Sequence, residues 1–277
     1  MTDKPYIPLP ENPIGIFDSG IGGLTVANAI NKLLPKESLI YFGDTAHLPY
    51  GEKSPAAIKS YALNISEVLL KHHCKIIVIA CNTASALAYK TVKDHVEGKV
   101  EVVSVIEPTV EFVTANNFAK HIGVIATKAT IKSDVYAEEI KKANKSIIVE
   151  SLATPLLAPM IEEGFFNNKI SKTIINDYLS RPKLKKIDTL ILACTHYPLI
   201  KPEIENYYKG KVKILDSTEI VAQKVKEKLQ ASHLLNKGKA RKHHFYVSDY
   251  TKSFEQSTRL FFTGNIKLEL LNIWKSF

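Results

Sequence analysis

Short apolar runs alternate with longer amphipathic stretches along most of the 277-residue chain. The short runs are typical of buried strands, and the longer stretches have the period of helices. Strands and helices in alternation predict βα units and a mainly parallel sheet. The predicted strands cover residues 14–17, 39–42, 76–80, 100–105, 121–125, 147–152, 189–193 and 212–215. The predicted helices cover residues 24–34, 55–72, 83–95, 133–143, 168–179 and 220–234.

The chain also repeats itself weakly. Residues 15–19 resemble residues 123–127, and the strand that ends at Cys81 resembles the strand that ends at Cys194, with offsets of 108 and 113 residues. Chance is the alternative explanation, because buried strands share the same apolar residue types. The repeat predicts an α/β fold of two pseudo-symmetric lobes, each with a mainly parallel sheet flanked by helices.

We expect the first lobe to comprise residues 1–107 plus 216–277 and the second to comprise residues 108–215. In open α/β sheets the ligand lies beyond the carboxyl ends of the strands. Two such lobes facing each other would place both cysteines at one cleft, which is the predicted active site.

Composition is that of an ordinary globular enzyme, with 45% apolar and 23% charged residues. No apolar run approaches the roughly 18 residues of a membrane span, so no membrane partner is expected. The first residues lack the pattern of a secretory or transit peptide, which predicts a cytoplasmic protein. The three cysteines are then expected to be free thiols rather than disulfides.

The net charge of +9 raises the question of nucleic-acid binding. Only three of the 37 basic residues are arginine, the side chain preferred for bidentate contacts to phosphate and guanine. The lysines are mostly scattered, so we expect a solvated surface and no nucleic-acid partner.

The glycine-rich segment of residues 15–25 matches neither common nucleotide fingerprint. It lacks the Lys-Ser/Thr end of a P-loop and the last glycine of G-x-G-x-x-G. A glycine-rich turn from strand to helix remains, and its N–H groups are suited to holding an anionic group such as a carboxylate.

Cys81 and Cys194 each end an apolar strand and are each followed by two hydrogen-bonding residues. A helix start lowers the pKa of a thiol, so we expect reactive thiolates here. Cys74 fits the alternative, a small buried hydrophobe. Zinc is a competing chemistry, since Cys81, Cys194 and His196 with another histidine would make a ligand set. No C-x2-C or H-x3-H spacing supports it, and no metal is expected.

At these residues the sequence resembles the glutamate racemase family. The resemblance covers residues 14–222 and rests on motifs in the family's order. These motifs are IFDSGIGGLT at 16–25, YFGDT at 41–45, LPYG at 48–51, ACNTA at 80–84, IEP at 106–108, GVIATKAT at 123–130 and CTHYPL at 194–199.

The resemblance implies interconversion of L-glutamate and D-glutamate without a cofactor, with Cys81 and Cys194 as bases on opposite faces of the α-carbon. Cys81 would deprotonate the D-enantiomer and Cys194 the L-enantiomer. The implied catalytic set is Cys81, Cys194, Asp18, His196 and Glu162. The implied substrate-binding set is Asp18, Ser19, Pro49, Tyr50, Gly51, Asn82, Thr83, Thr127, Thr195 and His196.

Residue chemistry alone leaves simpler roles open for the carboxylates, because Asp18 suits a turn or helix cap and Glu162 a solvated face. Relatives that supply D-glutamate serve peptidoglycan synthesis, and we expect the same role and a homodimer here. The functional alternatives are a racemase of aspartate or hydantoin and a non-catalytic carboxylate-binding regulator.

Overall fold

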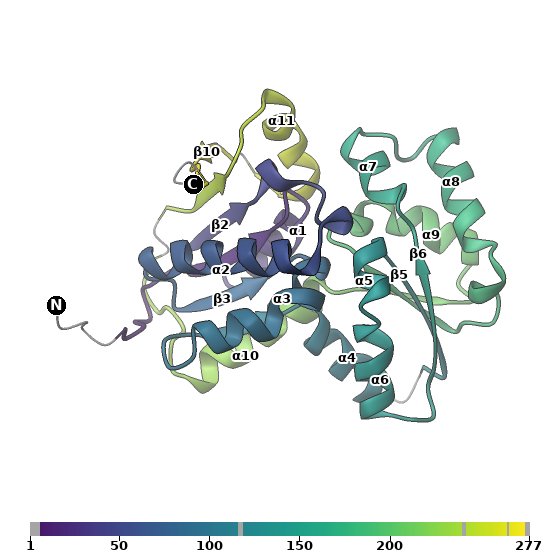
Figure 1. Cartoon of the computed structure of the whole chain (residues 1–277), viewed down its shortest axis with the longest axis horizontal. Helices are drawn as coiled ribbons and strands as arrows, with labels where there is room; N and C mark the ends of the chain where they lie inside the picture. The colour runs from purple at the N-terminus through teal and green to yellow at the C-terminus, as the bar shows by residue number, and fades with distance from the viewer. Residues whose placement is uncertain (1–5, 116–118, 240–241, 265, 275–277) are drawn as a thin grey trace.

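The computed structural model of the chain describes residues 6–115, 119–239, 242–264 and 266–274. Within these residues the strands form a six-stranded and a four-stranded sheet in which all neighbours are parallel. Figure 1 shows the two sheets in separate halves of the molecule, each flanked by helices. We call the six-stranded sheet with its helices the larger lobe and the four-stranded sheet with its helices the smaller lobe.

The larger lobe has the strand order β10-β9-β2-β1-β3-β4. Its strands are β1 (Ile14–Asp18), β2 (Leu39–Gly43), β3 (Ile76–Ile79), β4 (Glu101–Ser104), β9 (His244–Val247) and β10 (Leu268–Leu270). Its helices are α1 (Leu24–Leu33), α2 (Pro55–Lys71), α3 (Asn82–His95), α4 (Ile106–Ala115), α10 (Thr218–Ala231) and α11 (Lys252–Phe261).

The central strand β1 is buried on both faces, which is why its sequence is continuously apolar. Successive side chains of a strand point to opposite faces. Ile16 lies in one core with α1 and α10, whereas Phe17 lies in a second core with α2 and α3. The sheet is thus covered on both sides, and only its strand ends are left for a site.

The smaller lobe has the order β6-β5-β7-β8. Its strands are β5 (His121–Ala126), β6 (Ile148–Ala153), β7 (Thr189–Ala193) and β8 (Lys213–Asp216). Its helices are α5 (Lys128–Lys132), α6 (Val135–Ala143), α7 (Leu157–Glu162), α8 (Lys169–Leu179) and α9 (Lys201–Tyr208). Its apolar core is continuous with the α1 and α10 side of the larger lobe.

The predicted α/β fold with parallel sheets flanked by helices is confirmed. All eight predicted strands are present, and each end lies within one residue of its predicted position. The prediction missed β9, β10, α4, α5, α7, α9 and α11. A lobe boundary was expected at residues 107–108, but these residues lie in the first turn of α4. Proline is tolerated there because its missing N–H would have no partner in the helix.

The chain passes from the larger sheet to the smaller through α4 and returns between β8 and α10. In the C-terminal part, β9 pairs with β2 and β10 pairs with β9, so this segment extends the larger sheet. The division into residues 1–107 plus 216–277 and residues 108–215 stays a prediction. No helix in the described part of the chain is long and apolar enough to cross a membrane.

Candidate active site

The carboxyl ends of the strands bring the predicted site residues together. Asp18 ends β1, Cys81 follows the neighbouring β3, and Cys194 follows β7 of the smaller lobe. Both thiols are buried, with 5% of Cys81 and 8% of Cys194 exposed. Neighbouring residues link the two thiols: Ser19 lies 3.7 Å from the sulfur of Cys81, and Thr195, next to Cys194, donates to Asp18, next to Ser19, at 3.4 Å.

Cys81 caps the start of α3, where its sulfur accepts a hydrogen bond from the N–H of Ala84 at 3.4 Å. The thiol lies 3.7 Å from the hydroxyl oxygen of Ser19. Burial, and after it the charge of Asp18, raises the pKa of Cys81 to about 12, although Ala84 and Ser19 act in the opposite direction. The predicted lowering of this pKa is therefore wrong, because desolvation outweighs the single N–H donor at the helix start.

Cys194, His196 and Glu162 form a chain of three side chains. The sulfur of Cys194 lies 3.7 Å from Nδ1 of His196, and Nε2 of the same ring lies 2.8 Å from Oε1 of Glu162. Burial alone lowers the pKa of His196, but Cys194 and Glu162 outweigh it and raise this pKa well above its usual value. The ring is placed to hold a proton between a thiol and a carboxylate.

The glycine-rich turn after β1 holds the carboxylate of Asp18. Oδ2 of Asp18 accepts from the N–H of Gly20 at 3.1 Å, and Oδ1 accepts from the Thr195 hydroxyl at 3.4 Å. Burial raises the pKa of Asp18, while His196 and the N–H groups of Gly23 and Gly20 act to lower it. The bond from the N–H of Gly20 fits the turn role that residue chemistry left open, and the wholly buried carboxylate also bonds Thr195 of the other lobe.

The same turn lets the two lobes approach closely. A Cβ added to Gly22 would lie 2.5 Å from Cε1 of His196 and 2.6 Å from the Thr195 hydroxyl oxygen. Thr25, at the start of α1, donates to the carbonyl oxygen of Thr195 at 3.1 Å. The residues after Cys194 therefore pack directly on the turn and first helix of the larger lobe.

Hydroxyl groups join the lobes on the Cys81 side. The hydroxyl oxygens of Thr83 and Thr127 lie 2.9 Å apart, and each lies 3.1 Å from that of Thr130. Oδ1 of Asn82 accepts from the hydroxyl of Tyr136 at 2.8 Å, whereas its buried Nδ2 has no partner among the described residues. These groups can donate hydrogen bonds to a bound carboxylate or accept them from an ammonium group.

The Pro49-Tyr50-Gly51 turn reaches the smaller lobe with its backbone. A Cβ on Gly51 would lie 2.9 Å from Cβ of Thr127, so only glycine fits this approach. The Tyr50 hydroxyl points elsewhere and donates to Oδ2 of Asp44 at 2.7 Å. The predicted Tyr50-Gly51 pair therefore faces the smaller lobe with its main chain and not with the Tyr50 hydroxyl.

Several neighbours of the site were not predicted from the sequence. Thr130 and Tyr136 contact predicted substrate-binding residues, and the ring of Phe261 in α11 packs edge-on against His196 with centroids 5.4 Å apart. Asp44 directly follows β2, beside the strand that Asp18 ends, and it lies in the YFGDT motif of residues 41–45, although no role was assigned to it. The other contacts join distant segments and leave no local pattern.

The arrangement offers little to a metal ion. Cys194 and His196 are neighbours, but the described residues contain no group of three or more His, Cys, Asp or Glu side chains that could hold one. The ring of His47 stacks on Tyr61.

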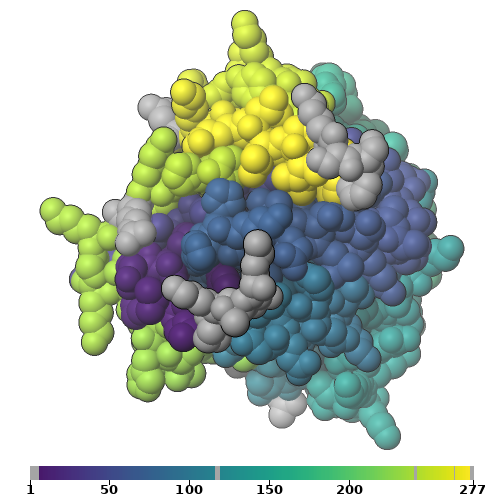
Figure 2. Space-filling model, turned by 60° about the vertical axis from the view of Figure 1, so that its left-hand side comes forward, coloured from purple at the N-terminus to yellow at the C-terminus, as the bar shows by residue number. Residues whose placement is uncertain are grey.

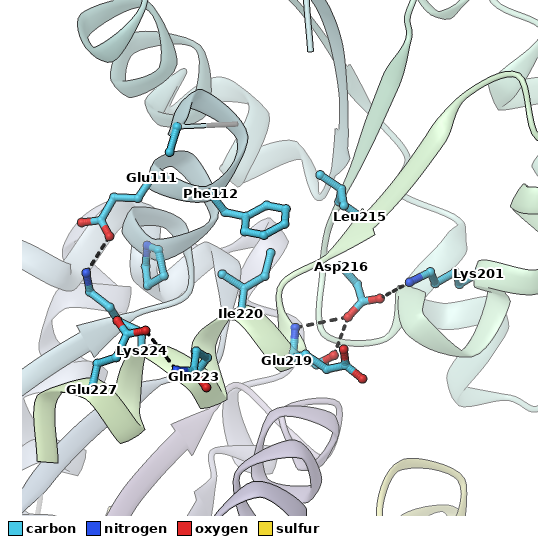
Figure 3. Close-up of a pocket in the computed structure, with 13 residues that line it drawn as sticks. Glu111, Phe112, Lys201, Leu215, Asp216, Glu219, Ile220, Gln223, Lys224 and Glu227 are labelled. Carbon is cyan, nitrogen blue, oxygen red and sulfur yellow. Dashed lines mark hydrogen bonds and ion pairs between the residues drawn. The ribbon is translucent and has the colours of Figure 1, made fainter. Parts of the chain in front are cut away.

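Open pockets lie away from the thiols. A pocket of about 590 Å³ opens between α4 and α10 (Figure 3), and ion pairs join Lys224 to Glu111 and Lys201 to Asp216 at its sides. A second pocket of about 680 Å³ lies between α1, α10 and α11. Neither is lined by Cys81, Cys194 or any other predicted site residue.

Comparison with known proteins identifies the family. Residues 14–225 match the family described as Asp/Glu/Hydantoin racemase. A glutamate racemase from Chlorobaculum parvum is 44% identical over 251 residues, which is 90% of this chain and 92% of that protein. The crystal structure of glutamate racemase from Francisella tularensis in complex with D-glutamate is 39% identical, with a TM-score of 0.91 over 96% of this chain and 100% of that one. The glutamate racemase isoform RacE1 from Bacillus anthracis is 32% identical, with a TM-score of 0.89 over 94% and 97% of the two chains. The chain therefore belongs to the Asp/Glu/hydantoin racemase family.

Proposed function

We propose that this chain interconverts L-glutamate and D-glutamate by moving the α-proton between Cys81 and Cys194, without a metal ion or cofactor. The observation that carries the proposal is the pair of buried thiols that follow strands of different lobes and are linked through Ser19, Asp18 and Thr195. The family and the named glutamate racemases support glutamate as the substrate.

Two thiols account for inversion where one would not. A thiolate on one face breaks the Cα–H bond and becomes a thiol, and the thiol on the opposite face donates its proton to the resulting carbanion and becomes a thiolate. A single base would tend to return the proton to the face from which it came. Each turnover therefore starts with one thiolate and one thiol and exchanges their states.

On the smaller-lobe side, Cys194 deprotonates the L-enantiomer. His196 lies next to its sulfur and has a raised pKa, so the ring accepts the thiol proton and holds it while Glu162 stabilises the imidazolium. A thiol next to a base, with a carboxylate that orients the base, is the arrangement by which enzymes generate a reactive thiolate.

On the larger-lobe side, Cys81 deprotonates the D-enantiomer. Its pKa of about 12 means that the thiol form dominates at neutral pH. The α-ammonium group of the substrate supplies a positive charge that favours the thiolate, and Asp18 holds that ammonium group. Ser19 stabilises the thiolate by hydrogen bonding.

The cross-lobe hydroxyl groups hold the substrate carboxylates. Thr83, Thr127 and Thr195 offer hydroxyl donors, and the unpartnered Nδ2 of Asn82 offers another. The main chain of residues 49–51 closes the same side, with Gly51 against Thr127. Closing the lobes around the substrate excludes water and strengthens these interactions.

We further propose that the lobes correspond to residues 1–107 plus 216–277 and residues 108–215, and that two chains form a homodimer. In the cell the enzyme would act in the cytoplasm and supply D-glutamate for peptidoglycan synthesis. These points follow from family membership and from the assignment of glutamate as substrate.

Circular dichroism of L-glutamate, followed with the purified chain after dialysis against a chelator, tests the proposal. We expect the signal to decay to zero without any added cofactor, and L-aspartate in a parallel cuvette to remain unchanged. Faster decay with aspartate would reassign the substrate. A rate that is lost on dialysis and restored by zinc would overturn the two-thiol mechanism.

A further inference from the structure

Asp44 lies at the meeting point of three neighbouring strands of the larger sheet. It directly follows β2, while Ser248 directly follows β9 and Trp274 lies beyond β10. Because these parallel strands are adjacent in the order β10-β9-β2, the segments after them emerge at one edge. Asp44 is wholly buried at this edge, outside the two-thiol site.

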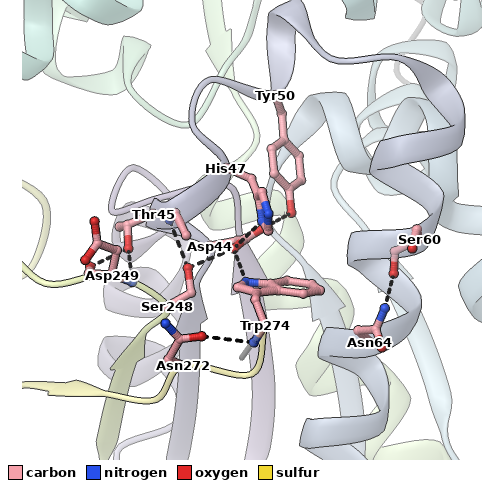
Figure 4. A network of polar contacts seen from close by, with 11 residues as sticks. Asp44, Thr45, His47, Tyr50, Ser60, Asn64, Ser248, Asp249, Asn272 and Trp274 are labelled. Atoms are coloured by element: carbon pink, nitrogen blue, oxygen red, sulfur yellow. Dashed lines mark hydrogen bonds and ion pairs between the residues drawn. The ribbon is translucent and has the colours of Figure 1, made fainter. Parts of the chain in front are cut away.

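Four side chains surround the Asp44 carboxylate (Figure 4). Oδ1 accepts from the Ser248 hydroxyl at 2.8 Å and from the indole N–H of Trp274 at 2.9 Å. Oδ2 accepts from the Tyr50 hydroxyl at 2.7 Å and lies 2.9 Å from Nδ1 of His47. A buried carboxylate is tolerated only when its oxygens are satisfied in this way, so the four groups are held in fixed positions.

Aromatic packing fixes the same group from the side. The His47 ring stacks on Tyr61 of α2 with centroids 3.9 Å apart, and Trp274 meets His47 edge-on at 4.6 Å and Tyr61 at 5.4 Å. Trp274 belongs to the C-terminal segment, whose yellow atoms lie on the surface beside the blue atoms of the first hundred residues (Figure 2). The end of the chain thus covers the start of the segment that contains residues 47–51.

The far side of this segment touches the smaller lobe. Gly51 packs on Thr127, and Glu52 pairs with Lys128 at 3.1 Å. The turn is therefore held at its base by Asp44 and meets the other lobe with its tip.

We propose that Asp44 and Trp274 are positioning residues that fix the 49–51 main chain against Thr127, and so set the affinity for substrate without touching it. This inference rests on the proposed function, since it assigns the 49–51 turn to substrate binding. The C-terminal segment then contributes to substrate binding, because Trp274 helps to hold the 49–51 turn in place.

Trp274→Phe is the decisive variant, because phenylalanine keeps a ring against His47 and Tyr61 but lacks the indole N–H. Tyr6→Phe is the matched control, since it also removes one donor, the hydroxyl that bonds the carbonyl oxygen of Cys74 at 2.8 Å in the same lobe. We expect Trp274→Phe to raise KM for both enantiomers by about tenfold, the order for one lost hydrogen bond to a charged group, with kcat within about twofold. Tyr6→Phe should lower the melting temperature about as much as Trp274→Phe does but leave KM unchanged.

Trp274 is the only tryptophan in the chain, so its fluorescence reports on the Asp44 group. We expect D-glutamate to change the emission of the unmodified protein with a midpoint near KM, and Tyr50→Phe to abolish the change by cutting the link to Asp44. Asp44→Asn should raise KM at least as much as Trp274→Phe. If Asp44→Asn does not fold, Trp274→Phe decides the question.

An unchanged KM in Trp274→Phe, or equal changes in Trp274→Phe and Tyr6→Phe, would overturn the positioning role. Either result would leave the proposed function intact as long as the unmodified protein racemises glutamate. Absence of racemisation in the unmodified protein would instead refute the proposed function.

Discussion

Replacing Gly22 by alanine tests whether the approach of the larger lobe to His196 sets the rate. The added Cβ would lie 2.5 Å from Cε1 and 2.6 Å from Nδ1 of His196. Carbon atoms in contact prefer separations of about 3.5–4.0 Å, so the ring or the turn must move by about 1 Å. The ring cannot turn aside freely, because Cys194, Glu162 and Phe261 surround it.

A displacement of this size is expected to be costly for the chemistry. Moving a catalytic group by about 1 Å lowers rates by roughly 10²-fold. That loss corresponds to about 2.7 kcal/mol of activation free energy. Because the two enantiomers have equal free energies, kcat/KM must fall by the same factor in both directions of racemisation, and racemisation alone does not show which thiol is affected.

Elimination from a substrate analogue with a β-leaving group separates the two sides. This reaction needs only the base that removes the α-proton, and its products do not return. We expect Gly22→Ala to slow elimination from the L-analogue, which depends on Cys194 and its neighbour His196, far more than elimination from the D-analogue. Gly238→Ala is the control, since among the described residues its added Cβ meets only the Asn236 side chain, at 3.4 Å. Equal slowing of both analogues in a folded Gly22→Ala protein would refute the assignment of His196 to one face.

Three further predictions concern the two thiols and two ion pairs outside the site. Cys81→Ser and Cys194→Ser should each lower the rate of racemisation by roughly 10³-fold or more. Cys81→Ser should still eliminate from the L-analogue, and Cys194→Ser from the D-analogue. If the chain were a regulator without catalysis, neither substitution would impair its function. Lys75→Met removes the ammonium group that pairs with the buried carboxylate of Glu37 at 2.5 Å. Urea titrations should then show a free energy of unfolding lower by about 3–5 kcal/mol, because an unpaired charge stays buried. A loss under about 1 kcal/mol would contradict this. Burial alone raises the pKa of Asp216, but its bonds to Lys201 and Thr218 outweigh burial and lower this pKa below 3.8. The stability that these bonds provide is therefore present above pH 3.8 and is lost as pH falls through the lowered pKa of the folded state. The melting temperature of Asp216→Asn, measured against pH, should lack this decline at acid pH.

Most of the strands were predictable because they are short and largely buried, whereas β6, which is mostly half-buried, is the exception. Each continuous apolar run could be read directly as a strand, and the eight runs chosen are all strands. Strand β9 and the edge strand β10 were missed because their apolar runs are too short to stand out: β9 has three apolar residues in a row, and Glu269 interrupts β10. Helix α4 was missed where a lobe boundary was expected at residues 107–108, and Pro108 is accommodated because the first turn of a helix accepts proline.

From residue chemistry alone, the site was predictable only where a residue ends or directly follows a strand, and the family resemblance supplied the other candidates, such as Glu162. Asp18, Cys81 and Cys194 share that position, and their chemistry can be read from it. The partners that set their pKa values come from other segments, such as Glu162 beside His196, and no spacing along the chain announces them. The error in the pKa of Cys81 has the same origin, since a sequence shows a helix start but not the depth of burial around it.

The contacts that orient the thiols are also the contacts that join the lobes. Thr195, next to Cys194, bonds both Asp18 and Thr25 of the larger lobe, and His196 packs on Gly22 of the glycine-rich turn. The angle between the lobes and the position of the acid–base groups are therefore coupled. A change at the lobe junction that never touches the substrate should therefore alter proton transfer, as we expect for Gly22→Ala.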